Sequence, residues 1–175
     1  GVEIGKDITI KELREDGYQA FYVAIGCQDG KVPPIPGSDA EDIEIAVDFL
    51  HRATEDQTQK MSGNVVVIGG GNVAVDCART AARFGGEHVA MYCLEDRETM
   101  PASADEIRET LEEEIAIENS WGPKEIQKDV DGKVKAVVFQ KCISVKDASG
   151  KFNPQYDEND TITVACDHLI FAVGQ

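Results

Sequence analysis

The sequence has few basic residues and no apolar run long enough to cross a membrane. Its 175 residues include 17 Lys and Arg against 33 Asp and Glu, which gives a formal net charge of −16. Such an excess of acid argues against binding to nucleic acid or to an anionic membrane surface, because both are themselves negative. The first residues also lack the basic-then-apolar pattern of a signal peptide. We therefore expect a cytoplasmic protein whose partners are small molecules or other proteins.

The sequence also lacks any clustering of cysteine. Its five cysteines lie at positions 27, 77, 93, 142 and 166, with no C-x-x-C pair and no zinc-like spacing. An odd, dispersed set excludes a disulfide framework, a structural zinc site and an iron–sulfur cluster. We expect reduced thiols, no metal site and no redox disulfide. Because 42% of the residues are hydrophobic, the chain can still bury a core of its own.

The first third of the chain combines an apolar run with a proline-rich segment. Residues 21–25 (Phe-Tyr-Val-Ala-Ile) form an unbroken apolar run that ends at a glycine, which predicts a strand buried on both faces. The segment 32–37 holds three prolines and is expected to be a non-helical connector. Ser38 and Glu41 have the spacing of a capping box, so we expect a helix over residues 39–55.

The middle of the chain has the pattern of a β-α-β unit. A β-branched run precedes three glycines, and an alanine-rich segment with helical spacing follows them. We expect a strand at 65–68, a helix at 72–84, a strand at 88–94, a helix at 103–114 opened by a second capping box, and a strand at 115–117, with Gly122 and Pro123 ending the unit.

The remaining residues favour antiparallel pairing. Asp131–Gly132 is a hairpin signal between segments 125–130 and 134–145. We expect a polar loop at 147–160 and a strand at 161–165. The sequence therefore predicts an antiparallel meander appended to the β-α-β core.

The glycines after the first of these strands fit the dinucleotide-binding pattern G-x-G-x-x-[GA]. Gly69 permits a tight turn, Gly71 lets the backbone approach a pyrophosphate at the helix N-terminus, and Ala74 is small enough for close helix–strand packing. The flanking strand and helix supply the context that the pattern alone lacks. Rather than a glycine turn without a ligand, we predict a dinucleotide site that includes Gly69, Gly70, Gly71, Asn72, Val73 and Ala74.

Glu95 follows the second strand, at the place of a ribose-binding carboxylate. A carboxylate there accepts hydrogen bonds from the adenosine ribose hydroxyls but repels a 2′-phosphate, which favours NAD(H) over NADP(H). Arg97 can instead fold back onto a phosphate, so we include it among the cofactor-binding residues. The alternative is that Glu95 is only the first member of an acidic surface block over residues 95–118.

Three segments together closely resemble the small (beta) subunit of glutamate synthase and its relatives. They are GGGNVAVDCART at 69–80, RETMPA at 97–102 and IFAVGQ at 170–175. The resemblance implies a flavoprotein with two dinucleotide-binding domains, in which the NAD(P)H domain is inserted into the FAD domain. In such proteins each domain ends in an apolar strand closing with Ala-x-Gly, which accounts for the similarity between residues 21–26 and 169–174.

This resemblance implies a division of the chain into three parts. Residues 1–36 would be the C-terminal piece of the first FAD-domain segment, residues 37–62 a connecting helix and linker, and residues 63–175 the NAD(P)-binding domain. The expected fold is therefore α/β, a Rossmann-like three-layer domain with an antiparallel meander, plus a strand and helix from the neighbouring domain. We expect both ends of the chain to continue into a longer protein.

The resemblance also implies further site residues. Gly174 would close the last strand at the cofactor, and Asp76 and Arg79 would support the site or form an ordinary ion pair with each other. Many relatives carry two arginines after the second strand that grip the 2′-phosphate of NADPH, whereas Leu94 and Glu95 stand in those places here. This departure agrees with the ribose argument for NAD(H).

The expected reaction is hydride transfer from the nicotinamide to FAD, and then electron transfer to a partner subunit or cluster. The chain has no second glycine motif for FAD, so alone it should bind NADH or NADPH without turnover, with no catalytic acid, base or nucleophile. Its partners would be the FAD domain of the same full-length chain and an electron-accepting subunit. Trp121 is expected to pack at the core or rim rather than to cover a nicotinamide, Cys27 to be a buried small residue, and His51 to be polar surface rather than a proton carrier. The alternative function is a non-catalytic NAD-sensing regulatory domain.

Overall fold

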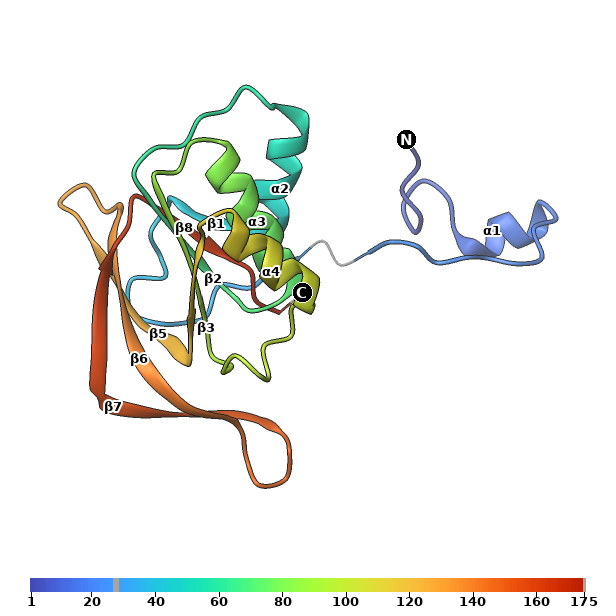
Figure 1. The fold of residues 1–175 in the computed structure, drawn as a ribbon. Coiled ribbons are helices and arrows are strands. Elements are labelled where there is room, and N and C mark those ends of the chain that lie inside the picture. The colour runs from blue at the N-terminus through green and yellow to red at the C-terminus, as the bar shows by residue number, and fades with distance from the viewer. Residues whose placement is uncertain (27–28, 175) are drawn as a thin grey trace.

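A computed structural model describes residues 1–26 and 29–174 of the chain (Figure 1). Its helices and strands are, in chain order, α1 (Ile10–Glu15), β1 (Ile43–Ile45), α2 (Ala46–Glu55), β2 (Asn64–Ile68), α3 (Asn72–Arg83), β3 (His88–Cys93), α4 (Ala104–Glu112), β4 (Ala116–Asn119), β5 (Trp121–Lys128), β6 (Val134–Lys146), β7 (Phe152–Ala165) and β8 (His168–Phe171).

The central layer is a parallel five-stranded sheet with the order β1-β8-β2-β3-β4. Helices α2, α3 and α4 cover one face, and the antiparallel sheet β5-β6-β7 covers the other (Figure 1). These three layers confirm the Rossmann-like α/β fold with an appended meander. Because all five strands are parallel, their carboxyl ends lie along one edge of the sheet, where α/β folds bind their ligands.

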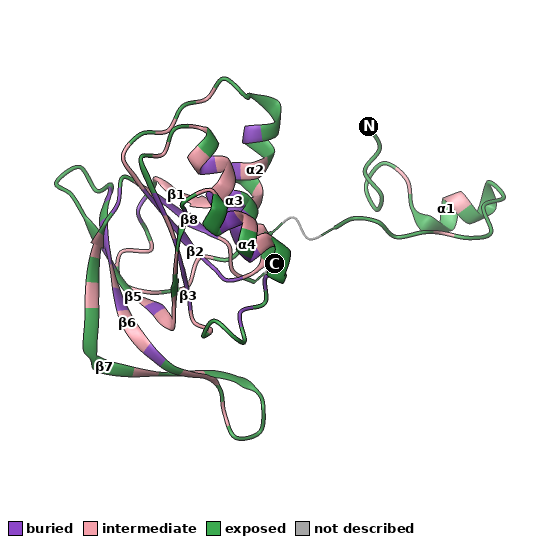
Figure 2. Ribbon diagram, viewed as in Figure 1, coloured by how far each residue is buried: buried purple, intermediate pink, exposed green. Residues whose placement is uncertain are grey.

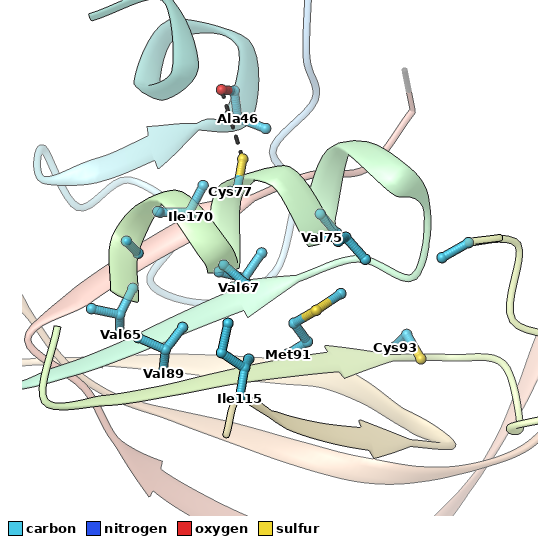
Figure 3. Close-up of a cluster of buried hydrophobic side chains, with 14 of the residues drawn as sticks. Ala46, Val65, Val67, Val75, Cys77, Val89, Met91, Cys93, Ile115 and Ile170 are labelled. Carbon is cyan, nitrogen blue, oxygen red and sulfur yellow. Dashed lines mark hydrogen bonds between the residues drawn. The ribbon is translucent and has the colours of Figure 1, made fainter. Parts of the chain in front are cut away.

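Strand β2 is apolar from Val65 to Ile68 because both of its faces are covered. Val65 and Val67 belong to the core beneath the helices, together with Cys77 of α3 (Figure 3). Val66 and Ile68 belong to a second core beneath the meander. Successive side chains of a strand point to opposite faces, so a strand between two layers needs an unbroken apolar run. The expected elements at β2, α3, β3, α4 and β4 are confirmed.

The helix expected over residues 39–55 begins later than predicted. Residues 43–45 instead form β1, which pairs with β8 in parallel, and α2 starts at Ala46. The N-cap of α2 is Ile45, and Ser38 lies in a turn where its amide donates to the Ile35 carbonyl. The alternating sequence Ile-Glu-Ile suits an edge strand. Its hydrogen-bonding partner β8 is far away in sequence, so the spacing of nearby residues does not predict this pairing.

The polar loop expected at 147–160 covers only residues 147–151. Residues 152–165 form β7, which pairs with β6 through several register shifts. Polar residues suit this ribbon because most of β7 is exposed, while β6 satisfies its backbone groups. Gly122 and Pro123, expected to end a unit, lie inside β5, which begins at Trp121.

The apolar run at 21–25 does not form the buried strand that was predicted. Tyr22, Val23 and Ile25 are 94%, 76% and 78% exposed. The segment extends away from the three layers, and almost all of it is exposed (Figure 2). The short helix α1 precedes this run in sequence, and its N-cap Thr9 forms a capping box with Glu12. The five strands of the parallel sheet come from other parts of the chain, so hydrophobicity alone did not place this run in a sheet.

Candidate functional site

A glycine turn joins β2 to α3 at the carboxyl edge of the parallel sheet. Gly69 has φ of 152°, and a Cβ atom there would lie 2.4 Å from the Ala172 carbonyl oxygen. Its amide donates to the Tyr92 carbonyl at 2.9 Å. The turn is therefore wedged between the ends of β8 and β3, and a residue with a side chain cannot replace Gly69 without displacing backbone.

Gly71 is a glycine for a different reason. It is the N-cap of α3 and has an ordinary φ of −94°, and a Cβ atom built on it would have no neighbour within 4 Å. The first hydrogen bond within α3 runs from the Ala74 amide to the Gly71 carbonyl, at 3.0 Å. The amides of Asn72 and Val73 precede that bond and are among the helix donors left to bind a ligand. This open approach to a helix N-terminus fits a pyrophosphate, whose negative charge the helix dipole favours.

Ala74 lies on the other side of this turn. It is 1% exposed and packs in the core beneath the helices. Its small side chain lets α3 lie close to the sheet, which is the role predicted for the last position of the motif.

A cavity of about 860 Å³ opens in front of the glycine turn. Its walls come from the connector at 31–35, the glycine turn, the ends of β3 and β8, and the meander. Besides Gly69, Gly70 and Gly71, its lining includes Lys31, Asn72, Val73, Tyr92, Glu95, Trp121, Tyr156 and Gly174. The structure thus brings most of the predicted cofactor residues to one cavity, and the predicted packing residue Trp121 forms part of its wall.

Glu95 stands where this cavity meets a smaller one of about 430 Å³. A Cβ atom on Gly70 would lie 3.1 Å from Glu95 Oε2, so the carboxylate is beside the glycine turn. The Glu95 carbonyl accepts hydrogen bonds from the Ser120 amide at 2.9 Å and from Asn119 Nδ2 at 3.2 Å. These bonds hold the residue at the end of β3. A carboxylate in this place can accept bonds from ribose hydroxyls.

Cys93, two residues before Glu95, is a packing residue. Cys93 is 3% exposed and lines the larger cavity. Burial, and next the nearby Glu95, raises the pKa of the Cys93 thiol to about 11. A thiol that stays protonated at neutral pH is a poor nucleophile, so we assign Cys93 no catalytic role.

The loop that joins β3 to α4 is tied to the glycine turn, a contact that was not predicted. Asn72 Oδ1 accepts a hydrogen bond from the Ser103 amide at 2.9 Å, and the Ala102 amide donates to the Gly70 carbonyl at 2.9 Å. Within the same loop, Asp96 Oδ1 accepts from the Thr99 hydroxyl at 2.7 Å. Hydrogen bonds from Thr99 lower the pKa of Asp96. The Met-Pro-Ala segment noted in the sequence was the available signal for this contact.

Two predicted arginines lie outside the cavity linings. Arg97 is exposed, and its assignment to the cofactor stays a prediction. Arg79 does not pair with Asp76. Its guanidinium instead contacts three carboxylates of α4 and its C-cap, at 3.4, 2.8 and 2.8 Å, from Glu106, Glu109 and Glu113 respectively. Arg79 therefore joins α3 to α4 and neutralises part of the acidic block.

The remaining candidates are a cysteine and a histidine. Cys27 lies outside the described residues. His51 is exposed and its imidazole lies 3.9 Å from Glu55. In residues 1–26 and 29–174, no group of His, Cys, Asp and Glu is arranged to hold a metal ion. None of the helices in that part of the chain combines the length and apolar character needed to span a membrane.

The sequence of the chain is similar to a family of known proteins. Residues 2–175 match the family described as pyridine nucleotide-disulphide oxidoreductase. The chain is 32% identical to the beta subunit of the NADPH-Fe(3+) oxidoreductase of Geobacter sulfurreducens, over 98% of this chain and 26% of that one. It is 34% identical to the small chain of glutamate synthase [NADPH] from Azospirillum brasilense, over 98% of this chain and 38% of that one.

The fold is also found in a solved structure. FprA from Mycobacterium tuberculosis superposes with a TM-score of 0.77 at 20% identity, over 99% of this chain and 53% of that one. The chain therefore spans about a quarter to two fifths of the two curated relatives and about half of this structure. The family match over almost its full length shows that the chain belongs to the pyridine nucleotide-disulphide oxidoreductase family.

Proposed function

We propose that this chain is the NAD(P)H-binding part of an FAD-dependent oxidoreductase that resembles the small subunit of glutamate synthase. The observation that carries the proposal is the open space at Gly71, between the N-terminus of α3 and a cavity large enough for a dinucleotide. The two relatives described above are named as subunits or chains that use NADPH, which supports an electron-accepting partner for the full protein.

The residues of this chain bind and orient the cofactor. When bound, the reduced nicotinamide would supply a hydride, and an FAD held elsewhere in the full-length protein would accept it. The glycine turn would hold the pyrophosphate through backbone amides, and Glu95 would accept hydrogen bonds from the adenosine ribose. We assign no acid, base or nucleophile to this chain.

We further propose a preference for NAD(H), because of Glu95. Its carboxylate lies beside Gly70, where it would repel a 2′-phosphate. The names of the relatives point to NADPH instead, so this preference would set the present chain apart from them. Arg97 would be the nearest basic residue in sequence to serve a 2′-phosphate, but it lies outside both cavity linings.

The test is calorimetric titration of the purified chain with NADH and NADPH at low salt. We expect NADH to bind more tightly. The variant Glu95→Ser should weaken NADH binding by about tenfold, since a charge-assisted hydrogen bond is lost, and should strengthen NADPH binding.

Glu98→Gln is the matched control, because this exposed carboxylate lies on the same loop and lines neither cavity. Tighter binding of NADPH by the wild-type chain would overturn the NAD(H) preference. Failure to bind either nucleotide would overturn the proposed function itself.

A further inference from the structure

Lys31, in the proline-rich connector, lies against the end of the last strand. A Cβ atom built on Gly174 would be 3.0 Å from Lys31 Cδ and 3.3 Å from Lys31 Cγ. The aliphatic part of the lysine therefore crosses the backbone of Gly174, which also has a positive φ of 74°. A side chain at position 174 would have to displace Lys31.

This contact places Lys31 on one side of the glycine turn and Glu95 on the other. Gly69 lies against Ala172, which is two residues before Gly174, the residue that Lys31 contacts. Glu95 lies against Gly70 on the opposite side, at the end of β3. In the sheet order β8-β2-β3, the turn after β2 stands between these two ends.

The larger cavity carries one charge of each sign, although the protein as a whole is strongly acidic. The chain has a net charge of −16, yet among the described residues lining the larger cavity Lys31 is the only cation and Glu95 the only anion. Lys31 makes no ion pair with any residue of 1–26 or 29–174. An unpaired ammonium on a cavity wall attracts an anionic ligand into a protein whose overall field repels it.

We propose that Lys31 is a cofactor-binding residue whose ammonium group pairs with the diphosphate of the dinucleotide from the nicotinamide side. The inference rests on the proposed function, because it takes the glycine turn as the pyrophosphate site. The adenosine half then extends past Glu95 toward the smaller cavity, and the nicotinamide half extends past Lys31 along the connector. The connector therefore contributes to cofactor affinity as well as joining two parts of the chain.

The experiment compares four ligands on the wild type and on Lys31→Gln by calorimetric titration at low and moderate salt. The ligands are NADH, ADP-ribose, ADP and AMP. We expect Lys31→Gln to weaken the binding of NADH, ADP-ribose and ADP by about five- to tenfold, because one charge-assisted contact is lost. The salt dependence of their binding should also fall. AMP lacks the second phosphate, so its affinity should change by less than about twofold.

Two further variants make the result specific. Lys31→Arg keeps the positive charge and should bind NADH within about twofold of the wild type. Lys135→Gln removes the same charge from an exposed position on β6 outside the cavity lining and should leave all four affinities unchanged.

Each contrary outcome has its own meaning. Wild-type affinity of Lys31→Gln for NADH would overturn the role of Lys31 while leaving the proposed function intact. Equal weakening of AMP and NADH, or an equal effect of Lys135→Gln, would show a general effect of net charge and would also overturn it. Failure of the wild-type chain to bind NADH would instead overturn the proposed function.

Discussion

Two apolar runs with similar sequences have opposite environments in this protein. Residues 169–173 (Leu-Ile-Phe-Ala-Val) carry most of β8 between β1 and β2, and Phe171 is fully buried. Residues 21–25 (Phe-Tyr-Val-Ala-Ile) form no strand, and Val23, which corresponds to Phe171, is 76% exposed. The glycines that end the runs are alike, since Gly26 and Gly174 have φ of 66° and 74°.

The comparison separates what a local sequence decides from what its surroundings decide. The final glycine takes the same backbone conformation in both places, because that preference is local. Strand formation differs, because a strand needs neighbours that pair with its backbone and cover its side chains. The three predictions that follow test this difference, beginning with the largest expected effect.

The first prediction concerns equivalent positions in the two runs. Phe171→Asp places a carboxylate without a partner between two layers and should cost more than about 5 kcal/mol, enough to unfold a domain of ordinary stability. Val23→Asp, at the corresponding exposed position, should change the free energy of unfolding by less than about 0.5 kcal/mol. Urea unfolding followed by circular dichroism measures both. A large loss of stability in Val23→Asp would show that the first run is also packed.

The second prediction concerns the glycine turn that lies against the buried run. Gly69→Ala should lower stability by about 2 to 3 kcal/mol, because its Cβ would meet the Ala172 carbonyl oxygen at 2.4 Å.

Gly71→Ala is the matched variant, because its Cβ meets nothing within 4 Å. It should change stability by less than about 1 kcal/mol, while NADH binding weakens more than about tenfold because the methyl group occupies the path of the pyrophosphate. Thermal unfolding and calorimetric titration separate the two effects. Unchanged NADH affinity in Gly71→Ala would contradict the assignment of this space to the cofactor.

The third prediction concerns the helical layer that covers the buried run. Cys77 of α3 packs in the same core as Ile170, and burial raises the pKa of its thiol to about 12, with Asp76 and Glu44 adding to the rise. Above about pH 9 the unfolded chain loses this proton while the folded chain retains it. The stability that the neutral thiol contributes is therefore present below pH 9 and is lost as pH rises toward 12, by up to about 1.4 kcal/mol per pH unit.

Urea unfolding near pH 8 and pH 10 measures this loss in the wild type and in Cys77→Ala. The decline should be smaller in the variant, which has no thiol to ionise at that position. Cys166, whose pKa burial also raises to about 12, stays in both proteins and contributes equally to each. Parallel declines would show that Cys77 does not ionise differently in the folded and unfolded states.

Much of the parallel core could be predicted from the sequence because each of its central elements carries its own signal. Strand β2 is apolar on both faces, and α3 begins directly after the three glycines. Strand β1 could not be predicted, because Ile43 fits the helical spacing of the following residues as well as it fits a strand. Strand β7 could not be predicted either, because a largely exposed ribbon needs no hydrophobic period.

The candidate site was predictable where its residues are neighbours in sequence. The motif from Gly69 to Ala74 identifies the turn, and the distance along the chain identifies Glu95. The link from Asn72 to Ser103 and the contact of Lys31 with Gly174 join residues 31 and 143 positions apart. Contacts of this kind depend on where separate loops meet after folding, which no local pattern contains.

The place of β8 in the sheet order has a consequence for how the protein is made. This strand follows the other four strands of the parallel sheet in sequence, yet it lies between β1 and β2. A ribosome releases residues 168–171 after the other four strands of this sheet, so the edge strand β1, made early, remains unpaired until β8 appears. We expect the position between β1 and β2 to remain unfilled in the growing chain until β8 has been synthesised. The wall of the cavity at Ala172 and Gly174 is therefore completed last.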